Sequence, residues 1–287
     1  MPSHVQHILA EHGTIVFPGV YDTLSALVAE QAGFPLIFIS GYAVSATLIG
    51  EPDLGLLTQT EVIDRARQIS RVVSIPVIVD ADTGYGNALN VARTVNDLID
   101  TGAAGCFLED QVWPKRCGHM LDKQVVTRNE YLEKIEAAVE TRGNRDFFIV
   151  ARTDALAAIG MDEALTRVQA AHAAGADATF VEAPNSLDEL EVIGREVPSP
   201  TVANMVEQGK TPILGKDKLT ELGFRLILYP VTGLYASARA LTITYNNLRK
   251  TGSTNGTTDQ LLAFEQFNKL IGIDKPNAHS SNRRSST

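Results

Sequence analysis

The sequence of 287 residues is poor in several features that mark common classes of protein. It has only two cysteines, so we expect thiols and no disulfide-stapled secreted fold. No apolar run approaches the roughly 18 residues that a membrane-spanning helix needs. Basic residues are outnumbered 25 to 34 by acidic ones, and the net charge of −9 argues against nucleic acid or an anionic membrane as a partner. The first residues lack the pattern of a secretory signal, so we expect a cytoplasmic protein.

What the sequence does contain is one pattern repeated from end to end, a short apolar run followed by a helix-like stretch. The apolar runs lie at 14–17, 36–39, 76–79, 105–108, 147–150, 178–181, 200–203 and 225–228. The helical stretches lie at 21–32, 60–73, 88–101, 129–140, 161–174, 187–196, 216–222 and 234–249. Eight such units predict an α/β fold, a (β/α)8 TIM barrel. A doubly wound open sheet ranks second, because the glycine-rich dinucleotide turn of that fold is missing.

The remaining C-terminal part is more polar and shows no second globular domain. We expect the barrel to occupy residues 1–252 and a helical extension to occupy 253–274. An amphipathic stretch at 259–271 lies within that extension. Residues 275–287 are low in apolar content, and we predict a disordered tail there.

Polar side chains follow the predicted strands, and in this barrel function collects at the carboxyl ends of the strands. Carboxylates at i and i+2 after the third run, with others after the fourth and sixth, offer oxygen ligands that suit Mg²⁺ or Mn²⁺ better than zinc. The alternative for any single acid is a helix cap or an ion pair. The polar residues are Ser40, Asp80, Asp82, Glu109, Asp110, Arg152, Asp154, Glu182, Asn204 and Tyr229.

The stretch "LEDQVWPKRCGHM" places Cys117 beside Lys115, Arg116 and His119. A zinc site is disfavoured because "CGH" offers two ligands with no second cluster. A disulfide to Cys106 is disfavoured because that residue lies inside an apparent buried strand. The neighbouring cations favour the thiolate, so a nucleophile and a general acid both remain open.

Several motifs together resemble the isocitrate lyase/phosphoenolpyruvate mutase superfamily over nearly the whole chain. They are "PGVYDTLSA", "GEPDLG", "DADTGYGN", "EDQ..PKRCGH", "ARTDA", "NMVEQGKTP" and "NLRKTG". The "KRCGH" loop is similar to that of the 2-methylisocitrate lyase and 2,3-dimethylmalate lyase branch. The resemblance implies a barrel whose last helix is exchanged with a neighbouring subunit, in a homotetramer that is a dimer of dimers.

The resemblance also implies a Mg²⁺ site, with Mn²⁺ as a substitute. Asp82 would contact the metal directly or through water, and Asp80 would support it. Asp53 and Glu109 would hold metal-bound waters. Cys117 would donate a proton to the nascent enolate carbon.

Other positions are implied to bind the substrate or to assist catalysis. Arg152 would bind a carboxylate or the enolate oxygen, and Glu182 and Asn204 would complete the pocket. Lys115 and His119 belong to the catalytic loop around the thiol. The further substrate-binding positions are Ser40, Gly41, Tyr42, Arg116, Gly118, Tyr229 and Pro230.

The activity that the resemblance implies is Mg²⁺-dependent carbon–carbon cleavage of a 2-hydroxy di- or tricarboxylate, by retro-aldol chemistry through an enolate. Typical 2-methylisocitrate lyases carry arginines where Tyr235 stands and near Phe264, so we expect a smaller substrate of the 2,3-dimethylmalate type. The alternatives are an oxaloacetate acetylhydrolase, a carboxyphosphonoenolpyruvate phosphonomutase and a non-catalytic barrel. Trp113 either shapes the apolar side of the pocket or packs its loop onto the barrel rim.

Overall fold

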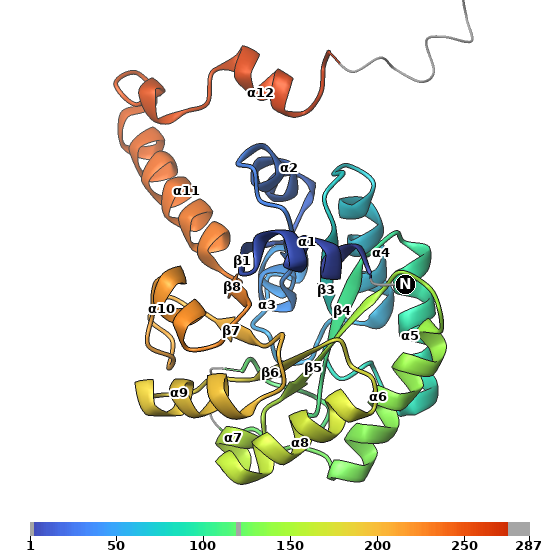
Figure 1. Cartoon of the computed structure of the whole chain (residues 1–287). Coiled ribbons are helices and arrows are strands. Elements are labelled where there is room, and N and C mark those ends of the chain that lie inside the picture. The colour runs from blue at the N-terminus through green and yellow to red at the C-terminus, as the bar shows by residue number, and fades with distance from the viewer. Residues whose placement is uncertain (1–2, 119–121, 275–287) are drawn as a thin grey trace, which may run out of the picture. The chain divides into compact units, whose positions relative to one another are not determined.

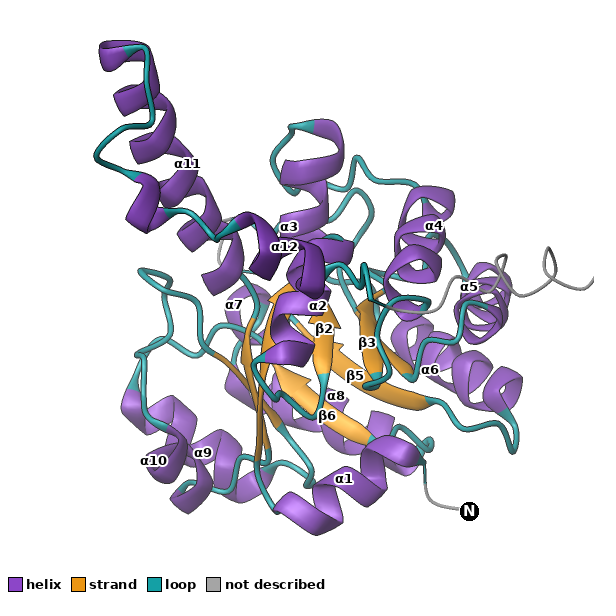
Figure 2. Cartoon of the chain, turned by 90° about the horizontal axis from the view of Figure 1, so that it is seen from above, coloured by secondary structure: helices purple, strands orange, loops and turns teal. Residues whose placement is uncertain are grey.

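A computed structural model of the protein describes residues 3–118 and 122–274. Its eight strands are all parallel and are hydrogen-bonded in the order β6-β5-β4-β3-β2-β1-β8-β7. A parallel bridge between Thr179 and Thr201 joins β6 to β7 and closes the ring. The predicted TIM barrel is confirmed, and helices surround the strands (Figure 1 and Figure 2). The strands are β1 (Ile15–Val20), β2 (Ile37–Ile39), β3 (Val77–Asp80), β4 (Gly105–Glu109), β5 (Phe148–Thr153), β6 (Ala178–Val181), β7 (Val202–Asn204) and β8 (Leu226–Tyr229).

Each predicted helix has a counterpart within a few residues of its expected ends. Several of these helices begin at a side-chain cap, as α4 does at Thr58, whose hydroxyl accepts from the Glu61 amide. The helices that match predictions within the barrel are α2 (Thr23–Gln31), α4 (Gln59–Ser70), α5 (Ala88–Asp100), α6 (Arg128–Arg142), α8 (Met161–Ala173), α9 (Leu187–Glu196) and α10 (Lys216–Glu221).

Four further elements were not predicted from the sequence. α1 (His4–His12) precedes the first predicted strand, and its Val5 and Ile8 are buried in the interior of the barrel. The other three are too short for a helical period to show. They are α3 (Gly41–Val44), the π-helical turn η1 (Ser45–Ile49) and α7 (Ala155–Ala158).

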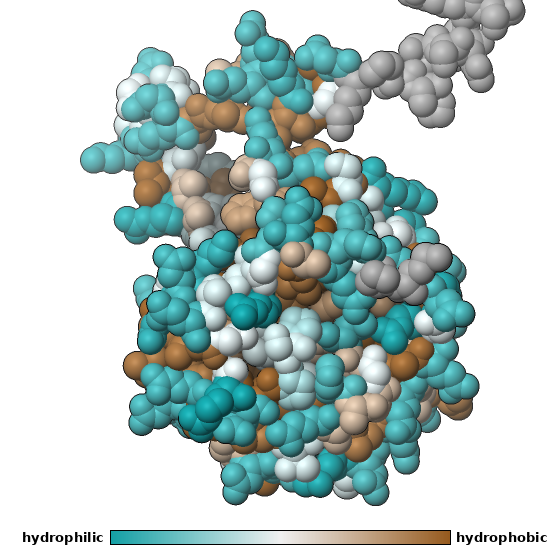
Figure 3. Space-filling view, in the orientation of Figure 1, coloured by the Kyte–Doolittle hydropathy of each residue, from teal (hydrophilic) through white to brown (hydrophobic). Residues whose placement is uncertain are grey.

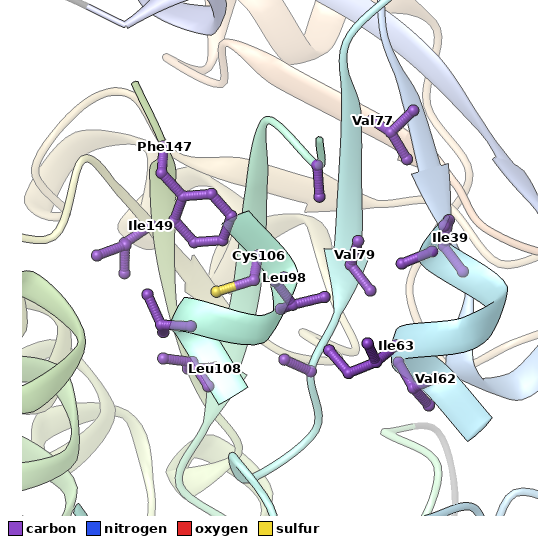
Figure 4. Packing of buried hydrophobic residues seen from close by; sticks show 14 of the residues in the cluster. Ile39, Val62, Ile63, Val77, Val79, Leu98, Cys106, Leu108, Phe147 and Ile149 are labelled. Carbon is purple, nitrogen blue, oxygen red and sulfur yellow. The ribbon is translucent and has the colours of Figure 1, made fainter. Parts of the chain in front are cut away.

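The core has one layer inside the barrel and others between the strands and the helices. Figure 4 shows part of an outer layer, where Cys106 of β4 lies among apolar side chains that include Leu98 and Phe147. Cys106 is fully buried, and both cysteines remain thiols as predicted. Each large apolar side chain buried in this way contributes about 1.5–3 kcal/mol to the free energy of folding.

The chain divides into two compact units, the first ending at Ala236 and the second beginning at Ser237. The division falls inside α11 (Thr232–Thr251), which no buried residue anchors in this single chain. The second unit also contains η2 (Thr258–Gln260) and α12 (Phe264–Leu270), within the predicted amphipathic stretch. Its exposed apolar side chains include Leu241, Leu262 and Phe264. Figure 3 shows brown, hydrophobic surface along this unit. Within the described ranges, no helix is long and apolar enough to cross a membrane.

Candidate active site

A cavity of about 380 Å³ lies at the carboxyl ends of the barrel strands. Side chains from seven strand ends and from the loop after β4 converge on it. Eleven of the predicted site residues line this cavity: Ser40, Tyr42, Asp53, Asp80, Lys115, Cys117, Gly118, Arg152, Glu182, Asn204 and Pro230.

Four carboxylates gather at one side of the cavity, and we call Asp53, Asp80, Asp82 and Glu109 the acidic cluster. All four side chains are buried. β3 ends at Asp80, and the chain then turns through Asp82, whose φ of 48° lets its amide donate to Asp80 Oδ1 at 3.3 Å. The ammonium of Lys115 lies 2.6 Å from Asp53 Oδ1 and 2.7 Å from Asp82 Oδ1. A single lysine from the loop therefore bridges two carboxylates of the cluster.

Burial and mutual repulsion disturb the protonation of this cluster. Burial raises the pKa of Asp82 to about 7, with the charges of Asp80 and Asp53 adding to the rise and Lys115 opposing it. Burial also raises the pKa of Glu109 well above its ordinary value, although Arg152 opposes that rise. The cluster thus holds more carboxyl groups than its cationic neighbours keep ionised, which favours an additional cation in place of a proton.

The acidic cluster fits a hard divalent cation. Its donors are all carboxylate oxygens, and Glu109 Oε1 is buried without a hydrogen-bond partner in the described chain. A Cβ at residue 41 would lie 2.9 Å from Asp80 Oδ2, so Gly41 keeps the space beside that carboxylate open. Within residues 3–118 and 122–274, no three acidic, histidine or cysteine side chains are arranged as direct ligands of one metal. That is compatible with Mg²⁺, which keeps several waters and needs only one or two carboxylates from the protein.

The second charged group of the site, which we call the Arg152 group, consists of Arg152 at the end of β5 with Asp154, Glu182 and Asn204 around it. Its guanidinium contacts Glu109 at 3.2 Å and Asp154 at 2.9 Å, and Glu182 Oε2 lies 3.7 Å from Nε. Asn204 donates its amide to both oxygens of Glu182 at 3.3 Å. The Asn204 carbonyl Oδ1 is buried without a partner among the described residues. Arg152 and Asn204 therefore offer oriented polar groups to a bound carboxylate or hydroxyl.

The loop after β4 brings the thiol to the same cavity. The Cys117 amide donates to the Asp53 carbonyl at 3.2 Å, which ties the loop to the segment that carries the acidic cluster. Gly118 packs directly on the Arg152 group, since a Cβ there would lie 2.5 Å from Glu182 Cδ and 2.6 Å from Arg152 Nη2. Any larger residue at position 118 would push the loop away, so the close approach requires glycine.

Some predicted site residues are not among the side chains that line the cavity. Asp82, Glu109 and Gly41 lie directly behind it, in contact with residues that do. Arg116 points to solvent and its backbone is held by the Gln111 side chain, while Tyr229 packs in an outer core layer. His119 lies outside the described residues.

Trp113 does not line this cavity in the described chain. Its ring stacks edge-on against Tyr85 with 5.7 Å between the ring centroids, and 41 % of the residue is exposed. Of the two alternatives from the sequence, packing of the loop onto the barrel rim fits this position.

The phenylalanine side chains that line the cavity were not predicted from the sequence. Phe38, Phe107 and Phe180 form a continuous aromatic floor, with centroid separations of 4.7 and 5.8 Å, and Arg152 lies 5.5 Å from the Phe180 ring centroid. The period-2 alternation of the strands was the signal that could have placed these inward-facing rings. Leu228 and Val231 also line the cavity, together with Tyr235 and with Val206, Glu207, Gln208, Gly209 and Lys210 of the "NMVEQGKTP" motif, which the sequence had already singled out.

The family of this barrel follows from comparison with known sequences. A family model described as phosphoenolpyruvate phosphomutase matches residues 6–249. The chain belongs to this family. Two relatives of this chain are named for different reactions, one for a phosphorylmutase and one for a lyase. Carboxyvinyl-carboxyphosphonate phosphorylmutase of Arabidopsis thaliana is 50% identical, over 93% of this chain and 80% of the relative. 2,3-Dimethylmalate lyase of Eubacterium barkeri is 43% identical, over 94% of both chains.

Solved structures of the same family agree in fold. A 2,3-dimethylmalate lyase, described as a phosphoenolpyruvate mutase/isocitrate lyase superfamily member, has a TM-score of 0.88 and 35% identity, over 97% of this chain and 92% of that one. An oxaloacetate acetylhydrolase with 3,3-difluorooxaloacetate has a TM-score of 0.89 and 36% identity, over 94% and 92%. A phosphonopyruvate hydrolase bound to oxalate and Mg²⁺ has a TM-score of 0.86 and 28% identity, over 99% and 98%. The predicted superfamily is confirmed, and the chain is an enzyme of it.

Proposed function

We propose that this enzyme is a Mg²⁺-dependent carbon–carbon lyase of a small substituted 2-hydroxydicarboxylate. The observation that carries the proposal is the convergence, in one cavity, of the acidic cluster, the Arg152 group and the Cys117 thiol. The first two stabilise negative charge on oxygen, and the third can deliver a proton to carbon. Retro-aldol cleavage of a 2-hydroxyacid needs both the stabilisation of charge on oxygen and the delivery of a proton to carbon.

The proton and electron steps can be assigned to residues of the cavity. A cavity carboxylate takes the hydroxyl proton, the carbon–carbon bond breaks to leave an α-oxoacid, and the electron pair forms an enolate on the departing carboxylic acid. Cys117 then gives its thiol proton to the enolate carbon and is reprotonated by the acid formed in the first step. Arg152 donates hydrogen bonds to substrate oxygen throughout. Bound Mg²⁺ supplies Lewis-acid stabilisation of charge on substrate oxygen, and Asp82 with its neighbours would hold it.

The composition of the cavity supports a small, partly apolar substrate. The aromatic floor of Phe38, Phe107 and Phe180 suits methyl substituents. Tyr235 also lines the cavity, with its ring edge-on to Tyr42 at 6.4 Å, and it carries no charge to pair with a third carboxylate. These features favour 2,3-dimethylmalate, the substrate in the name of one relative, over 2-methylisocitrate.

A substrate panel tests the reaction. Purified protein with Mg²⁺ is given 2,3-dimethylmalate, citramalate or 2-methylisocitrate, and pyruvate is followed by reduction with lactate dehydrogenase. We expect pyruvate from 2,3-dimethylmalate, lost on addition of EDTA and restored by Mg²⁺ or Mn²⁺. Absence of Mg²⁺-dependent cleavage of all three compounds would overturn the proposal.

The role of the thiol is tested by a matched pair of cysteine variants. Cys117→Ser should lower kcat by about 10²–10⁴, the typical contribution of a general acid, with Mg²⁺ and oxalate binding retained. Cys106→Ala changes the thiol buried in β4 and should keep kcat within a few-fold of the parent enzyme. Full activity of Cys117→Ser would show that its thiol is structural.

Two other reactions are favoured by particular comparisons. The likeness to oxaloacetate acetylhydrolase favours hydrolysis of oxaloacetate, which would appear as oxalate and acetate. The 50% identity to the phosphorylmutase favours a phosphonate-forming reaction, which would appear in the phosphorus NMR spectrum. Adding oxaloacetate and carboxyphosphonoenolpyruvate to the same substrate panel distinguishes all three activities.

We also propose that the enzyme is a homotetramer formed by exchange of α11 between subunits. The support is that none of the twenty residues of α11 is buried in the described chain. Light scattering after size-exclusion chromatography would report four times 31.0 kDa, and a monomer mass would contradict the proposal.

A further inference from the structure

A lysine outside the catalytic residues links the thiol loop to Arg152. The ammonium of Lys123 lies 2.7 Å from the Gly118 carbonyl and 2.5 Å from Asp154 Oδ1. Its side chain is 1 % exposed and that of Asp154 is fully buried. Burying an ammonium costs several kcal/mol unless its partners are well placed, so this lysine is held by these two acceptors.

The first acceptor belongs to the segment that carries the thiol. Gly118 follows Cys117 directly, and its backbone packs against Glu182 and Arg152 with no room for a side chain. A shift of the Gly118 carbonyl therefore moves Cys117 relative to the Arg152 group.

The second acceptor orients Arg152 itself. Asp154 accepts from Arg152 Nε at 2.9 Å and from Nη2 at 3.2 Å. Its amide is fixed by Asp110 Oδ1 at 2.8 Å. Burial by itself would raise the pKa of Asp154, but Arg152 and Lys123 outweigh it and hold the pKa below the ordinary value. Asp154 is therefore an ionised carboxylate whose Oδ1 accepts from both Lys123 and Arg152 and whose Oδ2 accepts from Arg152.

We propose that Lys123 is a positioning residue: by holding the Gly118 carbonyl and the Asp154 carboxylate together, it fixes the Cys117 thiol relative to the Arg152 guanidinium. The distance between the proton donor and the group that binds the developing charge is then set by one ammonium. Only the expected effect on turnover rests on the proposed lyase function. The effect on the position of Cys117 does not.

The test compares Lys123→Met with Lys134→Met. Lys134 is another buried lysine, but it forms an ion pair with Glu130 on the same helix, at 3.6 Å. The first readout is the rate at which iodoacetamide alkylates Cys117, located by mass spectrometry. The other cysteine, Cys106, is fully buried and serves as an internal reference.

Lys123→Met should alkylate at Cys117 about tenfold faster, which corresponds to the loss of one hydrogen bond to a charged group. Its kcat for the substrate found in the panel should fall about 100-fold, as expected for a misplaced reacting group, with a smaller change in KM. Lys134→Met should match the parent enzyme in both. Alkylation and kcat of Lys123→Met both within twofold of the parent would overturn the proposal.

The outcomes separate this inference from the lyase function. If the parent enzyme cleaves no compound of the panel, the lyase function fails while the alkylation rates still decide the role of Lys123. If Lys123→Met does not fold, the double variant Lys123→Met/Asp154→Asn takes the place of the single variant in the test. The second substitution removes the carboxylate that the first leaves without its cation. Fast alkylation of the double variant supports the proposal, and a rate equal to that of the parent overturns it.

Discussion

Two groups of buried charges meet at Arg152 and differ in how they are neutralised. In the acidic cluster, four carboxylates surround the single ammonium of Lys115. In the group that we call the paired network, Asp110 and Asp154 each face a cation of their own. Arg167 lies 3.0 Å from Asp110, and Lys123 lies 2.5 Å from Asp154.

The difference shows in the acidity of the two groups. The pKa of Asp82 is raised to about 7, mainly by burial, whereas the pKa of Asp154 is lowered because two cations outweigh its burial. Burial raises the pKa of Asp110 as well, so the contrast rests on Asp82 and Asp154. A surplus of buried carboxylates is costly and persists where a ligand relieves it, whereas removing one member of a balanced set leaves its partner as an uncompensated buried charge. The acidic cluster thus suits ligand binding, while the paired network holds Arg152 in place and makes the fold sensitive to the loss of any one partner.

The largest effect on stability is expected from breaking the paired network. Asp110→Ala removes the acceptor of the Asp154 amide, the Thr153 hydroxyl and the Arg167 guanidinium. The free energy of unfolding should fall by about 3–5 kcal/mol, the usual cost of leaving a buried charge without its partner. Urea denaturation at pH 7 measures it. The control Glu191→Ala, on the exposed side of α9, should change stability by less than about 0.5 kcal/mol. A loss below 1 kcal/mol for Asp110→Ala would place that carboxylate outside the stabilising set.

The opposite behaviour is expected for the acidic cluster. Asp82→Asn should weaken Mg²⁺ binding by about 100-fold, because it removes a charged ligand of the site. Without metal it should leave the protein as stable as the parent or more so, because one buried surplus charge is gone. Calorimetric titration with Mg²⁺ and urea denaturation without it give the two values. An unchanged Mg²⁺ affinity would move the metal site away from Asp82.

Protons and Mg²⁺ should compete for the acidic cluster. A carboxyl whose pKa is raised to about 7 is protonated below that pH, and Mg²⁺ binds the ionised form. The Mg²⁺ affinity should therefore rise about tenfold per pH unit below pH 7 and level off above it. Calorimetric titrations between pH 5.5 and 8.5 would trace this curve. A flat profile across this range would mean that Asp82 is already ionised without the metal.

Much of the fold could be predicted because each strand is a short, buried and mainly apolar run that is followed by a helix-like stretch. α1 could not be predicted, because its two buried residues, Val5 and Ile8, pack against side chains of the barrel interior that are distant in the sequence. Local periodicity carries no information about such a distant partner.

The site divides in the same way. The strand ends predicted that Asp80, Arg152 and Glu182 lie close together, because parallel strands bring their carboxyl ends to one side, and all three line the cavity. In the loop after β4, two neighbouring cationic residues differ in burial: Lys115 is buried against carboxylates, whereas Arg116 is exposed. Adjacent residues of an extended segment point to opposite sides, and the sequence does not say which side faces the barrel.

The smallest effect is expected at the edge of the paired network, where Glu163 links Arg167 to the more exposed Arg128. Arg128 and then Arg167 hold the pKa of Glu163 down to about 2 against the modest effect of burial. A lowered pKa in the folded state stabilises the protein above the unfolded pKa, near 4.5, and this contribution is lost as the pH falls through about 2. Glu163→Gln should therefore cost at most about 1 kcal/mol at pH 7, as for other partly exposed pairs, and nothing at the lowest pH at which the protein stays folded. Urea denaturation of both proteins at pH 7, 4 and 3 measures the difference. A loss of several kcal/mol at pH 7 would mean that Glu163 belongs to the paired network. A loss that stays the same at low pH would mean that the effect comes from packing and not from the charge of Glu163.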